Sequence, residues 1–547
     1  MSDPIATVNA VKSGVFHCTI RSAARGLPLE GQFCVIDTAA QRILGRVSQV
    51  DLVNPIHEDP VFQPLISDRG RLDYFSGEYA DIETCQVEVV SCVNREGGRP
   101  EARRGNPKSG TEVLPISDLR PFWRETQRQA IVGTLPGVGG GPVSVINKHY
   151  GDEEGGWGEA KHVGIFGQNG SGKTVLLLSL LAARMAANRG MGALLLDTKG
   201  DLAQDGHFDN RDSGFRFSFH DLLHAGGREF TAIRSDQIAI QRVEAFDAIL
   251  TDWLVGVQRL GKEENVEALV HRARPEVLRT AAGEERRQID SPGDIDYPAL
   301  MRMLADHARR GWATKSAADV KADDLRAWAD SPSDRESFER HVLRYFSGEF
   351  KIWGILDRVL RNGEIIMLKL ASATTAHQER IVYELLNRLT RVAEAASQKR
   401  GSETLNSVVI IDEAHRWVPQ GGKDRICLKI LDAIRTTRAY HVGWWLVSQS
   451  MAGVDKEAMR QMHTKWFGRG LDTGADIEHL KNYLGQSGKL EYDTLNYQGG
   501  YFFLGTGQEI NLGTGNSYQA AIGFSGDATD ALRRANPHLW GVAVSDR

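Results

Sequence analysis

The feature that most constrains this chain is a glycine-rich loop between an apolar segment and a helical one. Residues 163–166 read Val-Gly-Ile-Phe, residues 167–174 read Gly-Gln-Asn-Gly-Ser-Gly-Lys-Thr, and an apolar run begins at Val175. Glycines let the backbone curl until its N–H groups point at phosphate oxygens, and the amino end of a helix adds positive potential. The pattern predicts a strand, a phosphate-binding loop and a helix. A glycine turn without a ligand is disfavoured, because motif and flanking segments agree.

Each part of this loop has an expected role. The Lys173 ammonium would reach the β- and γ-phosphates of a nucleotide, and the Thr174 hydroxyl would join the ligands of a Mg²⁺ ion. The expected nucleotide-binding residues are Gly167, Asn169, Gly170, Ser171, Gly172, Lys173, Thr174 and Val175. We therefore expect ATP and Mg²⁺ as ligands of the chain.

The second half of a nucleotide site is expected at residues 408–413. Four consecutive large aliphatic residues, 408–411, are typical of a strand buried on both faces of a parallel sheet. Asp412 and Glu413 follow at its carboxyl end. Asp412 would hold Mg²⁺ through water, and Glu413 would orient the water that attacks the γ-phosphate. A solvated acidic pair is the alternative, and the hydrophobic run in front of it argues against that.

Two further segments fit the same sheet. Residues 193–196 lead to Asp197, and residues 442–447 lead to Ser448 and Gln449. Ligands of open α/β sheets bind beyond the carboxyl ends of the strands. The Gln449 amide is therefore expected to act as a sensor of the γ-phosphate.

Composition sets broad limits. The 547 residues allow two to four domains, and 41% apolar with 25% charged residues is ordinary for a globular chain. A net charge of −5 argues against a surface coated for nucleic-acid binding, but not against a basic channel. No signal or membrane segment is found, so we expect a cytoplasmic protein without a membrane partner. Five cysteines without C-x-x-C spacing are expected to be buried apolar residues.

Changes in pattern along the chain predict its organisation. Short strands without intervening helices predict a small N-terminal β-barrel, a Gly-rich stretch predicts a linker, and an amphipathic helical region interrupts the strand-helix alternation of the α/β core. The expected divisions are the barrel at 1–130, the linker at 131–158, the core at 159–235 and 351–525, the helical insertion at 236–350 and a C-terminal extension at 526–547.

One motif match is discounted. Residues 412–415 spell the DEAH box of a helicase superfamily, and residues 372–374 spell another of its motifs. In that superfamily the second motif follows the DEAH box, whereas here it precedes it, so this interpretation fails. His415 lacks metal-ligand spacing and is expected to be a surface residue or to support another residue of the site.

Taken together, the motifs resemble the HerA branch of the HerA/FtsK hexameric ATPases. The matching segments are the loop 167–174, Asp197-Thr-Lys-Gly-Asp201, Ile410 to Pro419, the basic helix with Arg435 and Arg438, Ser448-Gln449, and Phe467-Gly-Arg469. Two segments depart from the family pattern. Residues 419–423 are polar where an apolar continuation is usual, and Ser450 stands where an arginine often follows the glutamine.

The resemblance implies a RecA-like P-loop NTPase core with an N-terminal barrel similar to the HAS barrel. It also implies a homohexameric ring that hydrolyses ATP between subunits and moves double-stranded DNA through its channel as a DNA translocase or helicase. Family members act as motors for a partner effector, such as a nuclease or a sirtuin-like protein, in DNA processing or antiviral defence operons. We expect the effector to dock on the barrel.

Two arginines are candidates for an arginine finger acting on a neighbouring subunit. Arg438, or failing that Arg435, lies on a basic helix after the strand that ends in Glu413. A guanidinium bridges transition-state oxygens in a way that an ammonium does not. The alternative is a surface helix with solvated charges.

Two functions stay open on these patterns. The first is an ATP-driven DNA translocase, and the second is a nucleotide-dependent ring scaffold that activates an effector without productive translocation. A small-molecule kinase would need a second substrate pocket and a lid, for which the sequence shows no signature. DNA-stimulated ATPase activity separates the first two.

Overall fold

The structure of the chain is a computed structural model that describes most of its residues. They are residues 3–54, 81–95, 101–116, 118–122, 128–134, 142–200, 202, 206–210, 214–277, 288–289, 291–311, 315–398, 405–496, 501–512 and 518–541. Asp201, part of the motif after the second expected strand, lies outside them.

The centre of the molecule is a sheet of eleven strands in the order β13-β16-β10-β17-β18-β9-β19-β20-β21-β7-β8. The strands from β13 to β19 are parallel, and those from β20 onward pair antiparallel. Their bounds are β13 Phe230–Arg234, β16 Ile365–Lys369, β10 Gly192–Asp197, β17 Ser407–Ile411, β18 Val442–Ser448, β9 Val163–Phe166, β19 Thr464–Gly468, β20 Tyr501–Gly507, β21 Ala520–Phe524, β7 Gln129–Thr134 and β8 Pro142–Ile146. The predicted α/β fold is confirmed, and the expectation of a RecA-like P-loop core stays a prediction.

Helices cover both faces of this sheet, which explains the continuous aliphatic runs of its strands. In β17, Val408 and Ile410 pack on one face with α4 (Lys173–Ala187), α5 (Phe219–Ala225) and α17 (Ala528–Ala535). Val409 and Ile411 pack on the other face with α11 (Ile352–Leu360), α12 (Thr375–Gln398) and α14 (Arg425–Thr437). Among the described residues, no helix combines the length and apolar character needed to cross a membrane.

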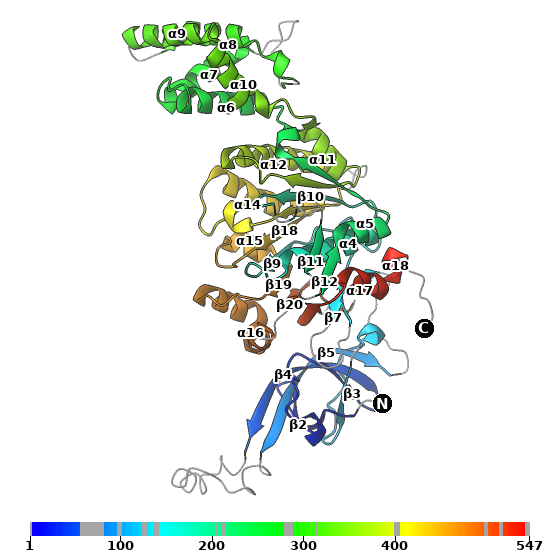
Figure 1. Ribbon diagram of the computed structural model, residues 1–547. Helices are drawn as coiled ribbons and strands as arrows, with labels where there is room; N and C mark the ends of the chain where they lie inside the picture. The colour runs from blue at the N-terminus through cyan, green and yellow to red at the C-terminus, as the bar shows by residue number, and fades with distance from the viewer. Residues whose placement is uncertain are drawn as a thin grey trace, which may run out of the picture.

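A closed barrel lies at one end of the molecule (Figure 1). Its strands are β1 (Ala6–Lys12), β2 (Val15–Ile20), β3 (Phe33–Asp37), β4 (Gln41–Val53), β5 (Ile82–Asn94) and β6 (Glu112–Pro115), in the order β1-β2-β5-β4-β3-β6. The expected small N-terminal barrel is confirmed. Cys18, Cys34, Cys85 and Cys92 lie in its hydrophobic core as free thiols, so the prediction of buried cysteines is confirmed.

The barrel packs directly on the α/β core through a buried ion pair. Arg46 of β4 pairs with Glu491 of α16 (Gly474–Asn496), and both side chains are almost fully buried. Burial lowers the pKa of Arg46 to about 10. Beside this pair, the rings of Phe33 and Tyr518 meet edge to face with centroids 5.5 Å apart. Removing one partner of such a pair leaves the other charge buried and unpaired, so the contact fixes the barrel on the core.

The Gly-rich stretch is predicted to be a linker, but its described residues include parts of two strands. Strands β7 and β8 fall at 129–134 and 142–146 and form the edge of the large sheet, where Gly523 of β21 pairs with Thr134. The C-terminal stretch differs as well, because α17 and α18 (Pro537–Trp540) pack in the core on the side of α4. Asn536 fastens them by accepting from the Ile131 N–H at 2.6 Å. Residues 135–141 of the expected linker lie outside the described residues. Of the described ones, Gly133 and Pro142 belong to the strands at the sheet edge.

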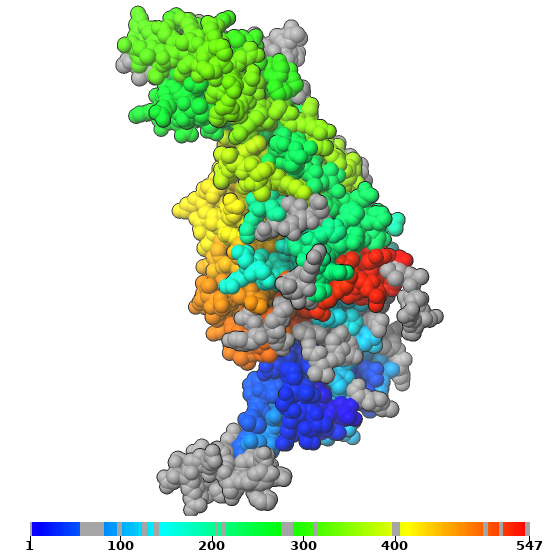
Figure 2. Space-filling model, viewed as in Figure 1, coloured from blue at the N-terminus to red at the C-terminus, as the bar shows by residue number. Residues whose placement is uncertain are grey.

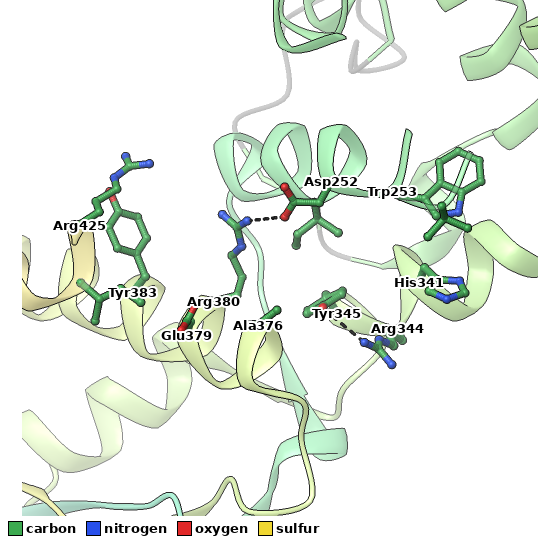
Figure 3. A pocket seen from close by; sticks show the side chains of 13 residues that line it. Asp252, Trp253, His341, Arg344, Tyr345, Ala376, Glu379, Arg380, Tyr383 and Arg425 are labelled. Carbon is green, nitrogen blue, oxygen red and sulfur yellow. Dashed lines mark hydrogen bonds and ion pairs between the residues drawn. The ribbon is translucent and has the colours of Figure 1, made fainter. Parts of the chain in front are cut away.

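The helical insertion forms the opposite end of an elongated molecule, as the space-filling view shows (Figure 2). It contains α6 (Val243–Gly256), α7 (Glu263–Val277), α8 (Tyr297–Gly311), α9 (Lys315–Ala329) and α10 (Pro332–His341). Its apolar residues continue into the core beneath α12. A cavity of about 410 Å³ lies at this junction, where Arg380 of α12 reaches Asp252 of α6 at 3.0 Å (Figure 3).

A buried histidine anchors the start of β9. The His162 ring is fully buried, its Nδ1 accepts from the Trp444 N–H at 3.0 Å, and its Nε2 lies 3.1 Å from the Ile434 carbonyl. This pattern requires the neutral ring with the proton on Nε2. Burial, with the nearby charge of His463, lowers the pKa of His162 to about 3. His162 therefore joins β9 to β18 and α14 only as a neutral group.

We expect acid to weaken the fold through this histidine. An unfolded histidine titrates near pH 6.5, and the folded His162 titrates only near its lowered pKa of about 3. Between these values the unfolded chain binds a proton that the folded chain does not, so stability falls by up to about 1.4 kcal/mol per pH unit. Denaturant unfolding at pH 7.5, 6 and 5 measures this. The His162→Gln variant should have a lower free energy of unfolding than wild type at pH 7.5, but this free energy should fall less on acidification. The control variant at an exposed histidine, His220→Gln, should show the wild-type dependence of the unfolding free energy on pH. An unchanged slope in His162→Gln would contradict the assignment.

Candidate nucleotide site

The glycine-rich loop connects β9 to α4 and has the backbone of a phosphate-binding loop. Gly170 and Gly172 have φ angles of 76° and 89°, a region that side chains with a Cβ rarely adopt. A Cβ on Gly172 would also lie 2.8 Å from the ring of Tyr501. Helix α4 begins at Lys173, so the N–H groups of its first turn face the loop. The local sequence thus dictates an anion-binding concavity.

Neighbouring strands hold the loop in place. The Gly167 N–H donates to the Ser448 carbonyl at 3.2 Å, and the Gln168 N–H donates to the Arg469 carbonyl at 2.9 Å. The Lys173 ammonium donates to the carbonyls of Gly167 at 2.7 Å and Gln168 at 3.0 Å. The lysine therefore lies over the loop whose N–H groups it would assist in binding phosphate.

The acidic pair follows β17 as predicted from the hydrophobic run. The Asp412 N–H donates to the Leu196 carbonyl at 3.4 Å, and the Glu413 N–H donates to the Asp412 carboxylate at 2.9 Å. Glu413 has φ 52° and ψ 47°. This left-handed conformation costs a non-glycine residue about 1–3 kcal/mol and is often found where a side chain must be aimed for function. The backbone turns sharply here between β17 and α13 (Ala414–Trp417).

Three side chains surround the carboxylate of Glu413. The Gln449 amide donates to Oε1 at 2.6 Å, and the Lys199 ammonium donates to Oε1 at 3.2 Å. The His415 Nδ1 lies 3.3 Å from Oε2. Glu413 is 4% exposed and Lys199 stands at the rim of the site, so the carboxylate is buried beneath a positive group.

These contacts set the protonation of the site. Burial raises the pKa of Glu413, but the hydrogen bonds from Gln449 and Lys199 outweigh it, so the pKa lies below its ordinary value. Burial lowers the pKa of His415, and the neighbouring carboxylate of Glu413 offsets this only in part. At neutral pH the site therefore contains an ionised glutamate beside a neutral imidazole.

The parallel sheet brings most predicted site residues together at the carboxyl ends of its strands. Gly167 follows β9, Glu413 follows β17 and Gln449 follows β18, and these three strands are neighbours in the sheet. The remaining loop residues, from Asn169 to Val175, lie on the same edge because they continue from β9 into α4. The catalytic and binding roles assigned to these residues stay predictions.

The two candidate arginines lie near the amino end of β18, away from the carboxyl ends of the strands where the other site residues lie. Arg438 begins the short 3-10 helix η7 (Arg438–Tyr440), just before β18, and its Nε lies 3.4 Å from Glu159. Arg435 is one turn earlier on α14, is more exposed, and pairs with Asp432 at 3.2 Å. All seven residues of β18 separate these arginines from the edge with Gln449, and each residue of a strand adds about 3.3 Å. Neither arginine can therefore reach the phosphate loop of its own subunit.

Lys199 is a site residue to which the sequence assigned no role. It stands two positions after the end of β10, within the Asp197-to-Asp201 motif, where the Gly200 N–H donates to the Asp197 carboxylate at 2.7 Å. Only the position of β10 beside β17 puts Lys199 on Glu413. His415, which the sequence left between surface and supporting roles, contacts the same carboxylate.

A divalent cation would be held largely by the nucleotide. Within the described ranges, no group of three or more His, Cys, Asp or Glu residues could hold a metal ion. The expected protein donors are the Thr174 hydroxyl and the Asp412 carboxylate. Two oxygen donors on one sheet edge fit Mg²⁺, which keeps several waters and takes substrate phosphates as ligands.

Comparisons with known proteins found weak likenesses among solved structures alone. No protein-family model and no curated protein matches this chain. Among solved structures, the chain is similar to VirB4 of Thermoanaerobacter pseudethanolicus, with 14% identity, a TM-score of 0.37, and 72% of this chain and 96% of that chain covered. The plasmid coupling protein TrwB, in complex with the GTP analogue GDPNP, matches with 12% identity, a TM-score of 0.37, and coverage of 75% and 93%.

A third similar structure is the genome packaging NTPase B204 of Sulfolobus turreted icosahedral virus 2, in complex with AMPPCP. It shows 9% identity and a TM-score of 0.28, and the match covers 66% of this chain and 96% of that chain. Likenesses of this size do not assign an activity.

The site geometry predicts separable effects on ATP binding. Hydrogen bonds to charged groups contribute about 1.5–3 kcal/mol, so Lys173→Ala should weaken ATP binding about tenfold or more. Glu413→Gln keeps the shape of the side chain and should bind ATP within about threefold of wild type, because the role predicted for the carboxylate is to orient water rather than to bind phosphate. Titration with a fluorescent ATP analogue measures both. Exposed Lys423→Ala serves as the control. Wild-type affinity in Lys173→Ala would contradict the loop assignment.

Proposed function

We propose that this protein is an ATP hydrolase that assembles as a homohexamer and drives movement along double-stranded DNA. The observation that supports hydrolysis best is the ionised, buried Glu413 held by Gln449 and Lys199 on the sheet edge that also carries the phosphate loop. A nucleotide-binding loop alone needs no such base. A carboxylate kept ionised beside the γ-phosphate position has the state that a general base requires.

The proposed reaction follows from these positions. Lys173 and the loop N–H groups bind the β- and γ-phosphates. Glu413 accepts a proton from water while the water oxygen attacks the γ-phosphorus. The bond from the γ-phosphorus to the bridging oxygen breaks, and ADP leaves with that electron pair. Mg²⁺, when held by Thr174 and Asp412, neutralises phosphate charge. Gln449 senses the γ-phosphate because it contacts Glu413 directly.

The arginines support a shared site between subunits. Because Arg438 and Arg435 lie at the edge opposite their own phosphate loop, either one acts on ATP only across a subunit boundary. A head-to-tail interface of this kind repeats around a closed ring. The hexamer, the double-stranded DNA and an effector docked on the barrel rest on the motif resemblance. In this proposal the effector is a nuclease or a sirtuin-like protein, and the setting is DNA processing or antiviral defence.

DNA stimulation of ATP hydrolysis tests the motor function. Steady-state phosphate release should rise several-fold when double-stranded DNA is added to the wild-type ring, and Glu413→Gln should abolish release with and without DNA. A light-scattering mass should correspond to six chains. Turnover that DNA leaves unchanged would remove translocation and favour the nucleotide-dependent scaffold. Absence of any turnover would overturn the ATPase assignment.

Subunit mixing tests the arginine finger. Lys173→Ala and Arg438→Ala rings should each be nearly inactive, and co-assembled mixtures should regain part of the ATPase activity. Recovery is expected because an intact phosphate loop of one subunit then meets an intact Arg438 of its neighbour. Mixing Lys173→Ala with Glu413→Gln is the control and should give no recovery, since both changes disable the same half-site. If Arg438→Ala alone keeps wild-type turnover, the same experiment with Arg435→Ala decides between the two arginines.

A further inference from the structure

The loop that carries Gln449 is fastened to a buried aspartate outside the motifs. Asp476 lies in the first turn of α16 and is 2% exposed. Its Oδ1 accepts from the Met451 N–H at 2.9 Å and the Ala452 N–H at 3.0 Å. The Ser450 hydroxyl donates to the same carboxylate at 3.0 Å. One side chain therefore binds three consecutive residues directly after Gln449.

These hydrogen bonds exceed what the start of a helix requires. Thr473 precedes α16 and exchanges a local pair of bonds with Asp476, because its hydroxyl donates to Oδ2 at 2.7 Å and accepts from the Asp476 N–H at 3.4 Å. That exchange caps the helix and uses Oδ2. The Oδ1 atom is directed to the loop instead. The Ser450 hydroxyl also lies 3.1 Å from Oδ2, so the oxygens share this one partner. The bonds to Met451 and Ala452 are made by Oδ1 alone, and the bonds to Thr473 can be removed without them.

The fastened loop determines where Gln449 points. Ser448 ends β18, so Gln449 is the single residue between a strand and the segment 450–452 bound by Asp476. Its amide reaches Glu413 at 2.6 Å. A residue held on both sides loses little further freedom when its side chain makes this bond. Ser450, which departs from the family pattern, supplies one of the bonds to Asp476.

We propose that Asp476 is a positioning residue that holds the 450–452 loop so that Gln449 orients Glu413 for ATP hydrolysis. This inference rests on the proposed function. Asp476 touches neither nucleotide nor water in this role and acts through Gln449. It should therefore affect the rate of hydrolysis and leave the affinity for ATP nearly unchanged, because the phosphate loop is held by other contacts, at Ser448 and Arg469.

The variants separate positioning from helix capping. Asp476→Ala removes both sets of bonds, whereas Thr473→Ala removes the cap and leaves Oδ1 on Met451 and Ala452. Misplacing a catalytic group by about 1 Å costs about 100-fold in rate. Asp476→Ala should therefore lower kcat about 10- to 100-fold with KM within about threefold of wild type. Asp476→Asn keeps an Oδ1 acceptor and should recover part of the rate. Thr473→Ala should lower the unfolding midpoint but keep kcat.

A second measurement does not depend on turnover. Amide hydrogen exchange in peptides covering 449–454 should speed up in Asp476→Ala and stay at the wild-type level in Thr473→Ala, because only the first variant frees the Met451 and Ala452 N–H groups. Failure of the proposed function appears as a wild-type ring without ATPase activity. The inference is overturned when wild type is active and Asp476→Ala keeps its kcat, when Thr473→Ala loses as much rate, or when exchange at 449–454 is unchanged. Should Asp476→Ala fail to fold, Asp476→Asn is measured instead, and the supporting result is then a smaller loss of kcat and a smaller rise in exchange, because this variant keeps Oδ1 but cannot accept from the Ser450 and Thr473 hydroxyls at its amide nitrogen. Wild-type kcat and wild-type exchange in Asp476→Asn would overturn the inference.

Discussion

The parallel pairing of β17, β18 and β9 is the constraint on which the candidate site depends. Parallel strands end at the same edge of a sheet, so residues far apart in the chain arrive together without any direct bond between them. The register pairs Ile411 with Leu446 and Ser448 with Phe166. It follows that Glu413, Gln449 and the phosphate loop are neighbours as soon as the sheet forms. The buried aliphatic faces of these strands enforce this register, because helices cover both sides.

The carboxylate of Glu413 shows how the rest of the site serves one group. Its backbone is left-handed and its side chain is buried, and both features are unfavourable in isolation. Hydrogen bonds from Gln449 and Lys199 compensate by stabilising the ionised form. The neutral His415 beside it adds a polar contact without competing for the proton. The energetic cost of the site is thus met by residues from three different strand ends.

Sequence reasoning predicted the parts of the structure that rest on local pattern. The strands at 163–166, 193–196 and 408–411 could be recognised because two-sided burial leaves unbroken aliphatic runs. The edge strands β7 and β8 could not, because Gly133 and Pro142 fall in a stretch with the signal of a linker, and because β21, the strand that joins β7 to the sheet, lies near the other end of the chain.

The same limit applies to the site itself. The phosphate loop and the Asp412–Glu413 pair have local motifs with known chemistry. Lys199 lies in the Asp197-to-Asp201 motif, but no chemistry was assigned to it there, and Asp476 lies in none of the motifs. Each gains its place only when β10 or α16 is positioned by the fold. A buried acid that accepts from backbone N–H groups looks, in sequence, like any aspartate near the start of a helix. The motif residues that come together at the candidate site were therefore predictable, and the residues that hold them were not.

Helix α16 links the nucleotide site to the barrel. Beyond Asp476, the Tyr492 hydroxyl donates to the Gly468 carbonyl at 2.8 Å and accepts from the Leu471 N–H at 2.9 Å, next to the strand end that holds Gln168. Glu491, one residue earlier, pairs with Arg46 of the barrel. Between these anchors Gly485 breaks the helix with φ 72° and ψ −177°.

This arrangement gives the barrel a role that a free tether would not allow. The half of α16 before Gly485 is fixed to the loop after Gln449. The half after Gly485 is fixed to the barrel by Glu491 and to the end of β19 by Tyr492. A shift of the barrel large enough to move Glu491 must either bend α16 at Gly485 or carry its first turn along. Bending is the easier response, because a glycine with open space around it offers the least resistance. In the proposed motor, an effector on the barrel would therefore be joined to the Gln449 loop through a hinge at Gly485, and to the end of β19 directly through Tyr492.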